Sequence, residues 1–342
     1  MSIRMGLVGY GVGGQLFHAP YLRASEACDL VGIVTRSPDR LVAAKKENPG
    51  VSVFASVSDL IDTGVDAVVI STPPSTRQAL VLEALGRGVH VVADKPFAPS
   101  AAAGRELARA ADEASLLLNV FHNRRYDSDI VTARAVIESG ELGRITRLDL
   151  RCDQDDPDTF EGGPTGGLLR DLGSHVVDQA LFLLGPARFV TAQLDEVETA
   201  AGPTDSGFFI TMEHEDGAHS HVSSSKLNRL SSRELRVHGE RGSYRSDYSD
   251  VQIDALRTGL QPAGRRGEWG YEHESRWGVL ATDADSRGVP SLQGDYAAYY
   301  DAFALAVQSG GPGPVPTLEG IAVLEVLDAA RISAAEHRTI AL

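Results

Sequence analysis

The chain has 342 residues, of which 42% are hydrophobic, and it carries a formal net charge of -15 at pH 7. A chain of this length and composition is typical of a folded protein with two domains, and nothing in it indicates disorder. The negative charge argues against nucleic acid or an anionic membrane surface as a partner, because it opposes the attraction to phosphate on which such binding depends. An anionic ligand would need a basic site of its own.

Neither a membrane span nor a disulfide framework is expected. No apolar run reaches the ~18 residues that a spanning helix requires. The N-terminus begins without a basic leader and cleavage site, so we expect a cytoplasmic protein. The two cysteines, Cys28 and Cys152, match neither a disulfide framework nor a zinc motif, and we expect each to be a small buried residue.

Short apolar runs alternate with amphipathic stretches from residue 3 to about residue 121. Strands separated by helix-length segments predict parallel βαβ units, in which ligands bind at the carboxyl ends of the strands. The expected strands are residues 3–8, 30–34, 51–54, 67–70, 89–93 and 116–121. The fold class predicted for this part is therefore α/β, with a doubly wound sheet.

A glycine-rich turn follows the first of these strands. It reads Gly9-Tyr10-Gly11-Val12-Gly13-Gly14, a G-x-G-x-x-G pattern that opens a helix. The glycines let the backbone approach a pyrophosphate, whose charge meets the N-terminus of the helix. A glycine-rich turn without a ligand is the weaker interpretation, because both the strand and the helix are in place. We predict a dinucleotide-binding Rossmann domain over residues 1–122, with Gly9, Gly11, Val12 and Gly14 at the cofactor.

The residues after the second strand bear on the choice of dinucleotide. An NAD site usually has Asp or Glu here, for the ribose hydroxyls. This chain instead has Thr35, Arg36 and Ser37, whose hydroxyls and guanidinium suit a 2′-phosphate. Arg40 and Lys45 add positive charge. The sequence predicts NADP(H) rather than NAD(H), and the alternative is that Arg36 covers the adenine or is solvated.

Two further strand ends lie on the ligand side of the expected sheet. After residues 67–70 comes a rigid turn in which we expect Thr72, Pro73 and Pro74 to line the nicotinamide ribose. After residues 89–93 comes Lys95, which is placed like a functional group rather than a solvated surface lysine. A cis bond before Pro96 would aim this lysine, but the sequence does not show whether one exists.

Past residue 121 the pattern changes to closely spaced strands separated by turn residues. This predicts a mainly antiparallel sheet, with one face covered by helices and the other open to a second copy. We expect helices at about 127–139, 294–308 and 317–335, and strands at 144–152, 188–196, 207–213, 218–226, 234–239 and 242–246. Residues 123–342 are thus predicted to be an α+β domain for substrate binding and oligomerisation, in a homodimer or homotetramer.

One helix of this domain carries an acid and a histidine four residues apart. Apolar residues at helical spacing and a Gly-Pro stop predict a helix through Asp171 and His175. At this spacing a carboxylate can fix the tautomer of an imidazole and stabilise its protonated form. Asp178 lies on the same face, which also suits a metal, but three mixed ligands in a dinucleotide-binding chain make that interpretation weaker.

Two other features receive ordinary interpretations. His214, His219 and His221 flank a turn, and we expect them on a polar outer face rather than at a metal. The segment from residue 257 to 287 contains Trp269 and Trp277. We expect an insertion whose tryptophans pack locally, rather than a loop that binds a partner.

On these residues the chain resembles, over its whole length, the glucose-fructose oxidoreductase, inositol dehydrogenase and MocA (Gfo/Idh/MocA) family. The resemblance is carried by the Rossmann glycines, by Asp94-Lys95-Pro96 where the family usually has Glu-Lys-Pro, and by Asp171-x-x-x-His175. The chain is most similar to the NADP-dependent scyllo-inositol dehydrogenase group, through Phe17-His18-Ala19-Pro20, Asn123-Arg124-Arg125, residues 171–179 and Gly294-Asp295-Tyr296. Arg77 replaces a histidine found in many members, and Arg170 replaces a usually apolar or aromatic residue.

The resemblance implies an NADP(H)-dependent enzyme that moves hydride between nicotinamide and a ring hydroxyl or ketone of an inositol, sugar or related polyol. In this scheme His175 takes the hydroxyl proton, Lys95 orients the oxygen and stabilises its developing negative charge, and Asp171 supports the imidazolium. Lys95 and His175 are therefore also expected to contact the substrate. Further candidates for such contacts are Asn123, Arg124 and, more weakly, Asp153 to Asp156. The loop from residue 155 to 168 is expected to form walls of the pocket.

No metal is expected. The chief alternative is an NADP(H)-binding sensor of the same fold that regulates a partner without turnover, and intact Lys95, Asp171 and His175 argue against it. A metal-dependent lyase or hydrolase is the third possibility.

Overall fold

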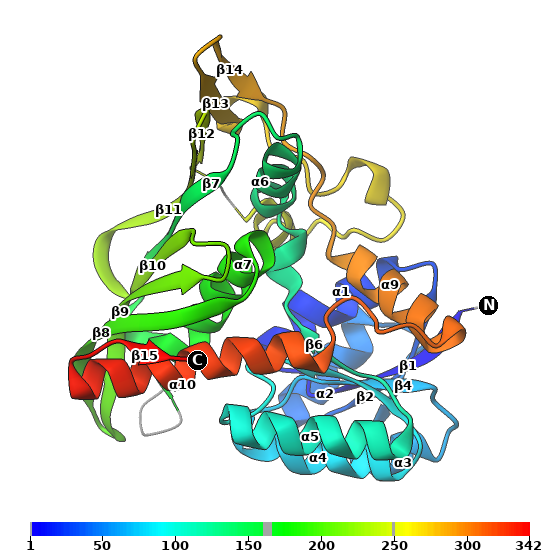
Figure 1. The fold of residues 1–342 in the computed structure, drawn as a ribbon. Coiled ribbons are helices and arrows are strands. Elements are labelled where there is room, and N and C mark those ends of the chain that lie inside the picture. Colours follow the sequence, from blue (N-terminus) through cyan, green and yellow to red (C-terminus); the bar gives the residue numbers. More distant parts are fainter. Residues whose placement is uncertain (1, 160–165, 248–249) are drawn as a thin grey trace. The chain divides into compact units, whose positions relative to one another are not determined.

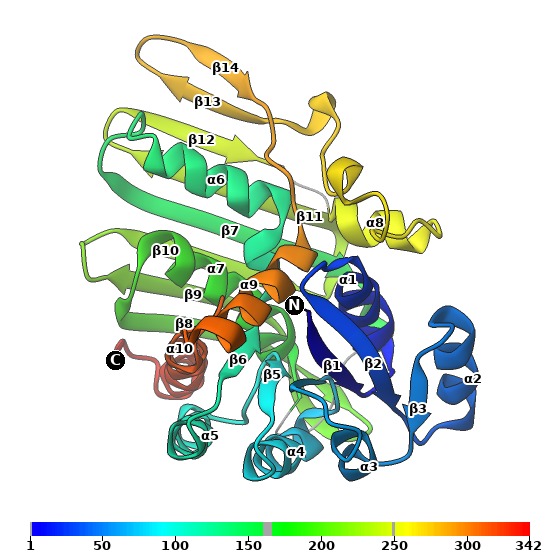
Figure 2. The same ribbon diagram turned by 90° about the vertical axis from the view of Figure 1, so that its right-hand side faces the viewer.

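The computed structural model describes residues 2–159, 166–247 and 250–342 and divides the chain into two compact units (Figures 1 and 2). The first unit comprises Met1–Tyr126, Gln252–Trp269 and Asp295–Ile321, and the second comprises Asp127–Val251, Gly270–Gly294 and Ala322–Leu342. Two segments from the C-terminal half of the chain therefore belong to the first unit, together with the residues in which we predicted the Rossmann domain.

A six-stranded parallel sheet forms the centre of the first unit. Its strands are short runs of β-branched and other apolar residues, buried because helices cover both faces. The strand order is β3-β2-β1-β4-β5-β6, so the chain reverses direction across the sheet between β3 and β4 and the sheet is doubly wound, as predicted. The strands are β1 (Ile3–Val8), β2 (Cys28–Val34), β3 (Ser52–Phe54), β4 (Ala67–Ile70), β5 (His90–Asp94) and β6 (Leu118–Phe121).

Some helices of this unit begin at a residue whose side chain satisfies one of their first N–H groups. Ser100 accepts a hydrogen bond from the Ala103 N–H group (3.3 Å), and Asp295 accepts one from Ala297 (2.9 Å). Helices α4 and α5 lie side by side on one face of the sheet (Figure 1). The helices are α1 (Ala19–Ala24), α2 (Pro38–Glu47), α3 (Val57–Ile61), α4 (Pro74–Gly86), α5 (Ala101–Ala114), α8 (Val251–Arg257) and α9 (Tyr296–Ser309).

The second unit is built on a nine-stranded sheet. Among the strands of the described residues, only the pair β7 and β10 is parallel, so the prediction of a mainly antiparallel sheet is confirmed. The order is β14-β13-β12-β11-β7-β10-β9-β8-β15. Its strands are β7 (Ile145–Asp155), β8 (Ala187–Thr199), β9 (Gly202–His214), β10 (His219–Ser225), β11 (Leu227–Gly239), β12 (Gly242–Ser246), β13 (Gly278–Thr282), β14 (Ser286–Val289) and β15 (Ile340–Ala341).

Helices α6 (Ser128–Glu138) and α7 (Ser174–Leu184) lie against one face of this sheet (Figure 2). Alternate residues of the strands turn toward them, so that Leu148, Leu150 and Val222 are buried. A last helix, α10 (Thr317–Glu336), begins in the first unit and continues into the second.

Three predictions about single residues have mixed outcomes. Cys28 and Cys152 are free and buried, as expected. Trp269 is buried, but it meets the ring of Tyr21 on α1 edge-on (6.3 Å), and Trp277 is exposed, so local packing of the two tryptophans is not confirmed. The expectation for His214 is wrong, because its side chain is fully buried rather than on the outer face. None of the described helices combines the length and the apolar character that a membrane span requires.

Candidate functional site

The glycine-rich turn follows β1 and is shaped by close contacts that only glycine allows. Gly9 has a φ of 103°, and a Cβ on it would lie 2.2 Å from the carbonyl oxygen of Ser71 at the end of β4. A Cβ on Gly14 would lie 2.3 Å from the carbonyl oxygen of Gly9. The turn is therefore closed on itself and against the neighbouring strand.

The outer side of the same turn is open. Val12 is 68% exposed, and a Cβ on Gly11 would meet only the guanidinium of Arg40, at 3.7 Å. The following helix starts as a π-helical turn (Gly13–His18) with no acid, and within the described residues no side chain caps its N-terminus. A helix start with no acid in its own first turn and with an open outer side fits the pyrophosphate of a dinucleotide.

The residues predicted to hold the 2′-phosphate lie between β2 and α2. Thr35 is buried (8% exposed), whereas Ser37 is half-buried and Arg36 is exposed. Arg40, in the first turn of α2, brings its guanidinium against Gly11 of the glycine-rich turn. The structure thus brings one of the two additional cations to the glycine-rich turn.

The Thr72-Pro73-Pro74 turn joins β4 to α4. The Thr72 hydroxyl oxygen is buried and has no hydrogen-bond partner among the described residues. A buried hydroxyl in this position, at the carboxyl end of a central strand, fits the contact to the cofactor that we expected there.

Arg77 occupies the position where the resemblance leads us to expect histidine. Arg77 is buried, with 5% of its surface exposed. Its guanidinium donates to the carbonyl oxygen of Thr72 (2.7 Å) and to that of Pro96. Arg77 therefore ties the turn after β4 to the turn after β5, which carries Lys95.

Lys95 directly follows β5 and is partly exposed, and its peptide bond to Pro96 is cis. The preceding Asp94 accepts hydrogen bonds from the Lys95 N–H group and from the Ser71 hydroxyl, both at 2.9 Å. The Nε2 atom of His18 lies 3.4 Å from the same carboxylate. Burial raises the pKa of Asp94, but His18, Arg77 and Lys95 outweigh it and hold the pKa well below its ordinary value.

His18 links Asp94 to the interior of the first unit. The imidazole is fully buried, and its Nδ1 atom lies 2.6 Å from the hydroxyl of Tyr300 on α9. Burial raises the pKa of Tyr300 well above its ordinary value, so this hydroxyl keeps its proton. The arrangement favours Tyr300 donating to Nδ1, with the ring proton on Nε2 facing Asp94.

Asn123 and Arg124 lie in a short 3₁₀ turn (Asn123–Tyr126) that follows β6. Asn123 is buried at 3% exposure, whereas Arg124 is half-buried. The neighbouring Arg125 is buried and pairs with Glu319. These residues lie at the same carboxyl edge of the parallel sheet as Lys95.

In the second unit, Asp171 and His175 lie in one continuous helical segment, but its first part is not the α-helix that we predicted. Leu169–Gly173 is a π-helical turn, and α7 begins only at Ser174. The Asp171 side chain is 42% exposed, whereas His175 is buried at 8% and Asp178 at 1%. Single π-helical turns inside helices are frequently found at functional sites.

Lys226, which the sequence analysis did not identify, is the ion-pair partner of Asp171. Its Nζ atom lies 3.1 Å from Asp171 Oδ2 and donates to the carbonyl oxygen of Thr159 at 3.2 Å. The two residues are 55 positions apart. No local spacing in the sequence relates them, so only the folded sheet reveals the pair.

Asp205 of β9 holds the beginning of the helical segment. Its carboxylate accepts a hydrogen bond from the Leu169 N–H group (2.5 Å) and lies 3.6 Å from the guanidinium of Arg331. Burial raises the pKa of Asp205, and the Leu169 hydrogen bond and Arg331 oppose this rise only in part. A Cβ on Gly167, which has a φ of 98°, would collide with the same carboxylate.

The acids at the end of β7 are engaged in the sheet. Asp153 is buried and accepts hydrogen bonds from Arg151 (2.5 Å), the Ser225 N–H group (3.0 Å) and Asn228 (2.8 Å). Asp155 is exposed and pairs with Arg229 at 3.0 Å. Part of the predicted pocket loop, residues 160–165, lies outside the described residues.

The sequence-predicted residues gather within each unit as follows. In the first unit, the glycine-rich turn, the Thr72 turn and Lys95 follow β1, β4 and β5, which are neighbours in the sheet, so they meet at one edge. In the second unit, Asp171 and His175 share one helical segment. Within the described residues, no group of three His, Cys, Asp or Glu side chains is arranged to hold a metal ion.

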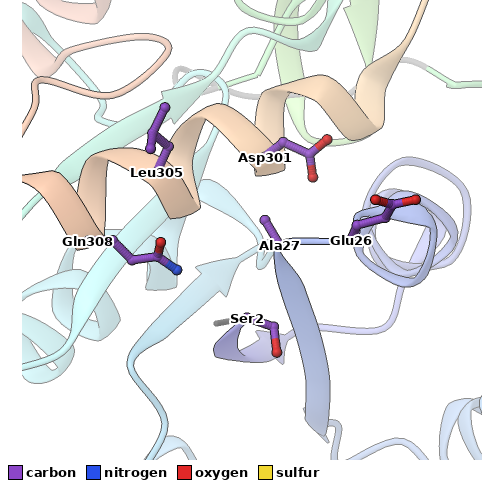
Figure 3. A pocket seen from close by; sticks show the side chains of 6 residues that line it. All are labelled: Ser2, Glu26, Ala27, Asp301, Leu305 and Gln308. Atoms are coloured by element: carbon purple, nitrogen blue, oxygen red, sulfur yellow. The ribbon is translucent and has the colours of Figure 1, made fainter.

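An open cavity of about 460 Å³ lies elsewhere in the first unit. Ser2 and Ala27 place it at the amino ends of β1 and β2, the edge opposite the glycine-rich turn, and Figure 3 shows side chains from α9 above it. Because dinucleotides bind at the carboxyl edge of such sheets, this cavity is not the cofactor site. Its lining residues are Ser2, Glu26, Ala27, Asp301, Leu305 and Gln308.

Comparison with known proteins identifies the family. Residues 3–122 match the model of the oxidoreductase family with an NAD-binding Rossmann fold, and residues 130–245 match the GFO/IDH/MocA C-terminal domain. The chain is 31% identical to scyllo-inositol 2-dehydrogenase (NADP(+)) IolW of Bacillus subtilis, across 100% of this chain and 96% of that protein. It is 25% identical to inositol 2-dehydrogenase of Rhizobium meliloti over the full length of both.

Solved structures show the same fold over the whole chain. The structure of yvaA from Bacillus subtilis superposes with a TM-score of 0.91 at 31% identity and covers 100% of this chain and 99% of that one. The sequence matches, the two sheets and the glycine-rich turn agree with one another. The protein is therefore an oxidoreductase that belongs to the Gfo/Idh/MocA family.

Proposed function

We propose that the protein is an NADP(H)-dependent dehydrogenase that transfers hydride between nicotinamide and a ring hydroxyl or ketone of an inositol, sugar or related polyol. The observation that carries the proposal is Lys95, held by Asp94 and Arg77 at the carboxyl edge of the sheet, beside the glycine-rich turn. The names of the relatives from Bacillus subtilis and Rhizobium meliloti support the substrate class.

The proposed chemistry divides among three side chains. Bound NADP supplies the hydride acceptor. In the oxidation direction, Lys95 donates a hydrogen bond to the substrate hydroxyl oxygen and stabilises the negative charge that develops on it. His175 accepts the hydroxyl proton, and Asp171 supports the resulting imidazolium. In the opposite direction the same groups reduce a ketone.

The preference for NADP(H) rests on Arg36 and Ser37, together with Arg40 beside the glycine-rich turn and the absence of an acid after β2. We expect NADPH to bind more tightly than NADH, which fluorescence titration of the two would measure. A clear preference for NADH would contradict the assignment. The cytoplasmic location and the homodimer or homotetramer stay predictions from the sequence.

A screen of inositols, sugars and their keto forms with NADP(H), followed at 340 nm, tests the activity. Positioned acid–base groups contribute about 10²- to 10⁴-fold, so His175→Ala should lower kcat by that factor and leave NADPH binding unchanged. His219→Ala is the matched control, because His219 is exposed on β10. Wild-type turnover in H175A would remove His175 from the scheme. Tight NADPH binding without turnover across the panel would favour the non-catalytic sensor.

A further inference from the structure

We propose that Lys226 is a positioning residue. Its ion pair with Asp171 orients the carboxylate that supports His175 and offsets part of the negative charge of that carboxylate. The inference rests on the proposed function for the roles of Asp171 and His175. The ion pair itself is a feature of the folded second unit.

The Lys226 ammonium group is held in one place. Its side chain is 7% exposed, and Nζ reaches both Asp171 Oδ2 (3.1 Å) and the Thr159 carbonyl oxygen (3.2 Å). Lysine is rarely buried, and a buried ammonium costs free energy unless it is paired and hydrogen-bonded. The buried cation is stabilised by Asp171. In turn it fixes one oxygen of the Asp171 carboxylate, whose side chain is 42% exposed.

The backbone of Lys226 is also fixed. Its N–H group donates to the carbonyl oxygen of Ser206 on β9 (3.0 Å), and its own carbonyl oxygen accepts from the Asp156 N–H group (3.0 Å). The lysine lies directly after β10, in the centre of the nine-stranded sheet. The ammonium is thus presented from the single residue that joins β10 to β11.

This pair bears on His175 through the proposed function, in which Asp171 supports the imidazolium of His175, four residues further along the same helical segment. A carboxylate without a cation stabilises a nearby imidazolium. Lys226 offsets part of that negative charge and takes up one of the two carboxylate oxygens. It therefore favours neutral His175, the form that can accept a proton from a hydroxyl.

Other charged or titratable groups also lie on this segment or on the elements packed against it. They include Arg170 and Asp178 on the segment itself, Cys152 and Asp153 on β7, Arg134 on α6, and Asp205, with its partner Arg331, and His214 on β9. All of them are retained in the variants described below. A difference between those variants and the wild type is therefore due to position 226.

The test compares Lys226→Met, Lys226→Gln and Lys226→Arg with the control Arg229→Met. Arg229 lies three residues further along and pairs with the exposed Asp155, so R229M removes one cation of the same unit at the surface. Steady-state kinetics with a substrate from the screen gives kcat and KM. NMR titration of the His175 ring, assigned by the loss of its signal in H175N, gives a readout that needs no turnover.

We expect K226M and K226Q to lower kcat about 10- to 100-fold, as misplacement of a catalytic group does, while NADPH binding is unchanged. The midpoint of the His175 titration should rise by about half a pH unit or more in both, because a nearby positive charge is lost. K226R should retain most of kcat and a midpoint close to that of the wild type. R229M should change neither.

A His175 titration that is the same in wild type, K226M and K226Q would overturn the proposal. If circular dichroism shows that K226M is unfolded, K226Q serves as the test, because it keeps a hydrogen-bond donor. If the wild-type protein turns over no member of the panel, the proposed function fails. The NMR titration still decides whether Lys226 acts on His175.

Discussion

At the scale of single residues, two charges of opposite sign, the buried Arg77 and the partly exposed Asp94, hold the turn that presents Lys95. Asp94 connects this turn to Ser71 and His18, and Arg77 connects it to the turn after β4. A planar guanidinium with several fixed donors can reach two carbonyl oxygens at once. Arg77 therefore has a structural role that follows from its geometry.

Replacing Arg77 tests that role. Arg77→Met keeps an unbranched side chain but leaves the carbonyl oxygens of Thr72 and Pro96 without this donor. Hydrogen bonds to charged groups contribute about 1.5–3 kcal/mol each, so we expect the loss of two to lower the free energy of unfolding by about 3–6 kcal/mol. Urea denaturation followed by circular dichroism measures this loss.

Arg87→Met is the control for this prediction. Arg87 follows α4 and pairs with the exposed Asp62 at the surface, so its removal should cost less than about 1 kcal/mol. If R77M were as stable as R87M, the two hydrogen bonds of Arg77 would contribute nothing measurable to the fold.

Which residues the sequence could identify depends on how far away their partners are. Gly9, Gly14 and Lys95 are identified by their place relative to a strand, which is a local property. Lys226 and Asp205 are not, because each acts on a residue 55 or 36 positions away. Their roles depend on strands that meet only in the folded sheet.

At the scale of elements, the helix that carries Asp171 and His175 shows both the strength and the limit of pattern reading. Apolar spacing and the Gly-Pro stop predicted its end near residue 185, and the structure has it end at Leu184. The π-helical turn at its start was missed. The Leu169 N–H group at the start of this turn donates a hydrogen bond to Asp205 on strand β9. No periodicity within the helix encodes that contact.

Gly167, just before this π-helical turn, offers a sharp test of that packing. A Cβ on Gly167 would be strained by a φ of 98° and would lie 2.1 Å from Asp205 Oδ1. Gly217 has a similar φ of 85°, but a Cβ there would meet nothing within 4 Å. Gly217→Ala should therefore cost about 1 kcal/mol, the price of the backbone conformation alone.

We expect Gly167→Ala to cost clearly more than Gly217→Ala, by roughly 1–3 kcal/mol, because the side chain also overpacks a buried carboxylate. Urea denaturation of both variants and the wild type gives the difference. Equal losses in the two variants would show that Asp205 moves aside without penalty and does not fix the start of the helix.

Strands β13, β14 and β15 were not predicted from the sequence, and each of them buries few residues. In β14, all residues but the last are exposed, and in β13 only two residues are buried. Strands near the edge of a sheet bury little apolar surface, so their sequences lack the alternation that predicts a strand. The central strands of both sheets, which bury more, were all predicted.

At the scale of the whole molecule, each unit contains a histidine whose pKa is lowered by burial: the half-buried His90 in the first and the fully buried His214 in the second. In the first unit, His90 accepts a hydrogen bond from the Leu117 N–H group through Nδ1 (2.9 Å). In the second, His214 lies 2.8 Å from both the Gly185 carbonyl oxygen and the Ser220 hydroxyl, and neither the Gly185 hydrogen bond nor Asp216 offsets its burial. Burial therefore favours the neutral form of both rings in the folded protein.

This predicts that acid weakens both units. Because the folded-state pKa of each histidine lies below the unfolded value of about 6.5, the unfolded chain binds more protons as the pH falls below that value. The stabilisation is complete above about pH 6.5 and is lost as the pH falls toward the folded-state pKa. Asp94, whose pKa is lowered from about 4, contributes only in more acidic solution.

Urea denaturation at a series of pH values between about 7.5 and 5 tests this prediction. His214→Asn keeps a donor for Gly185 but does not titrate, so it should be less stable than the wild type at neutral pH and lose less stability on acidification. His219→Asn, on the exposed face of β10, should retain the wild-type slope. If H214N and the wild type lost stability in parallel, burial of His214 would not be a cause of the acid sensitivity, and His90→Asn would remain to account for it.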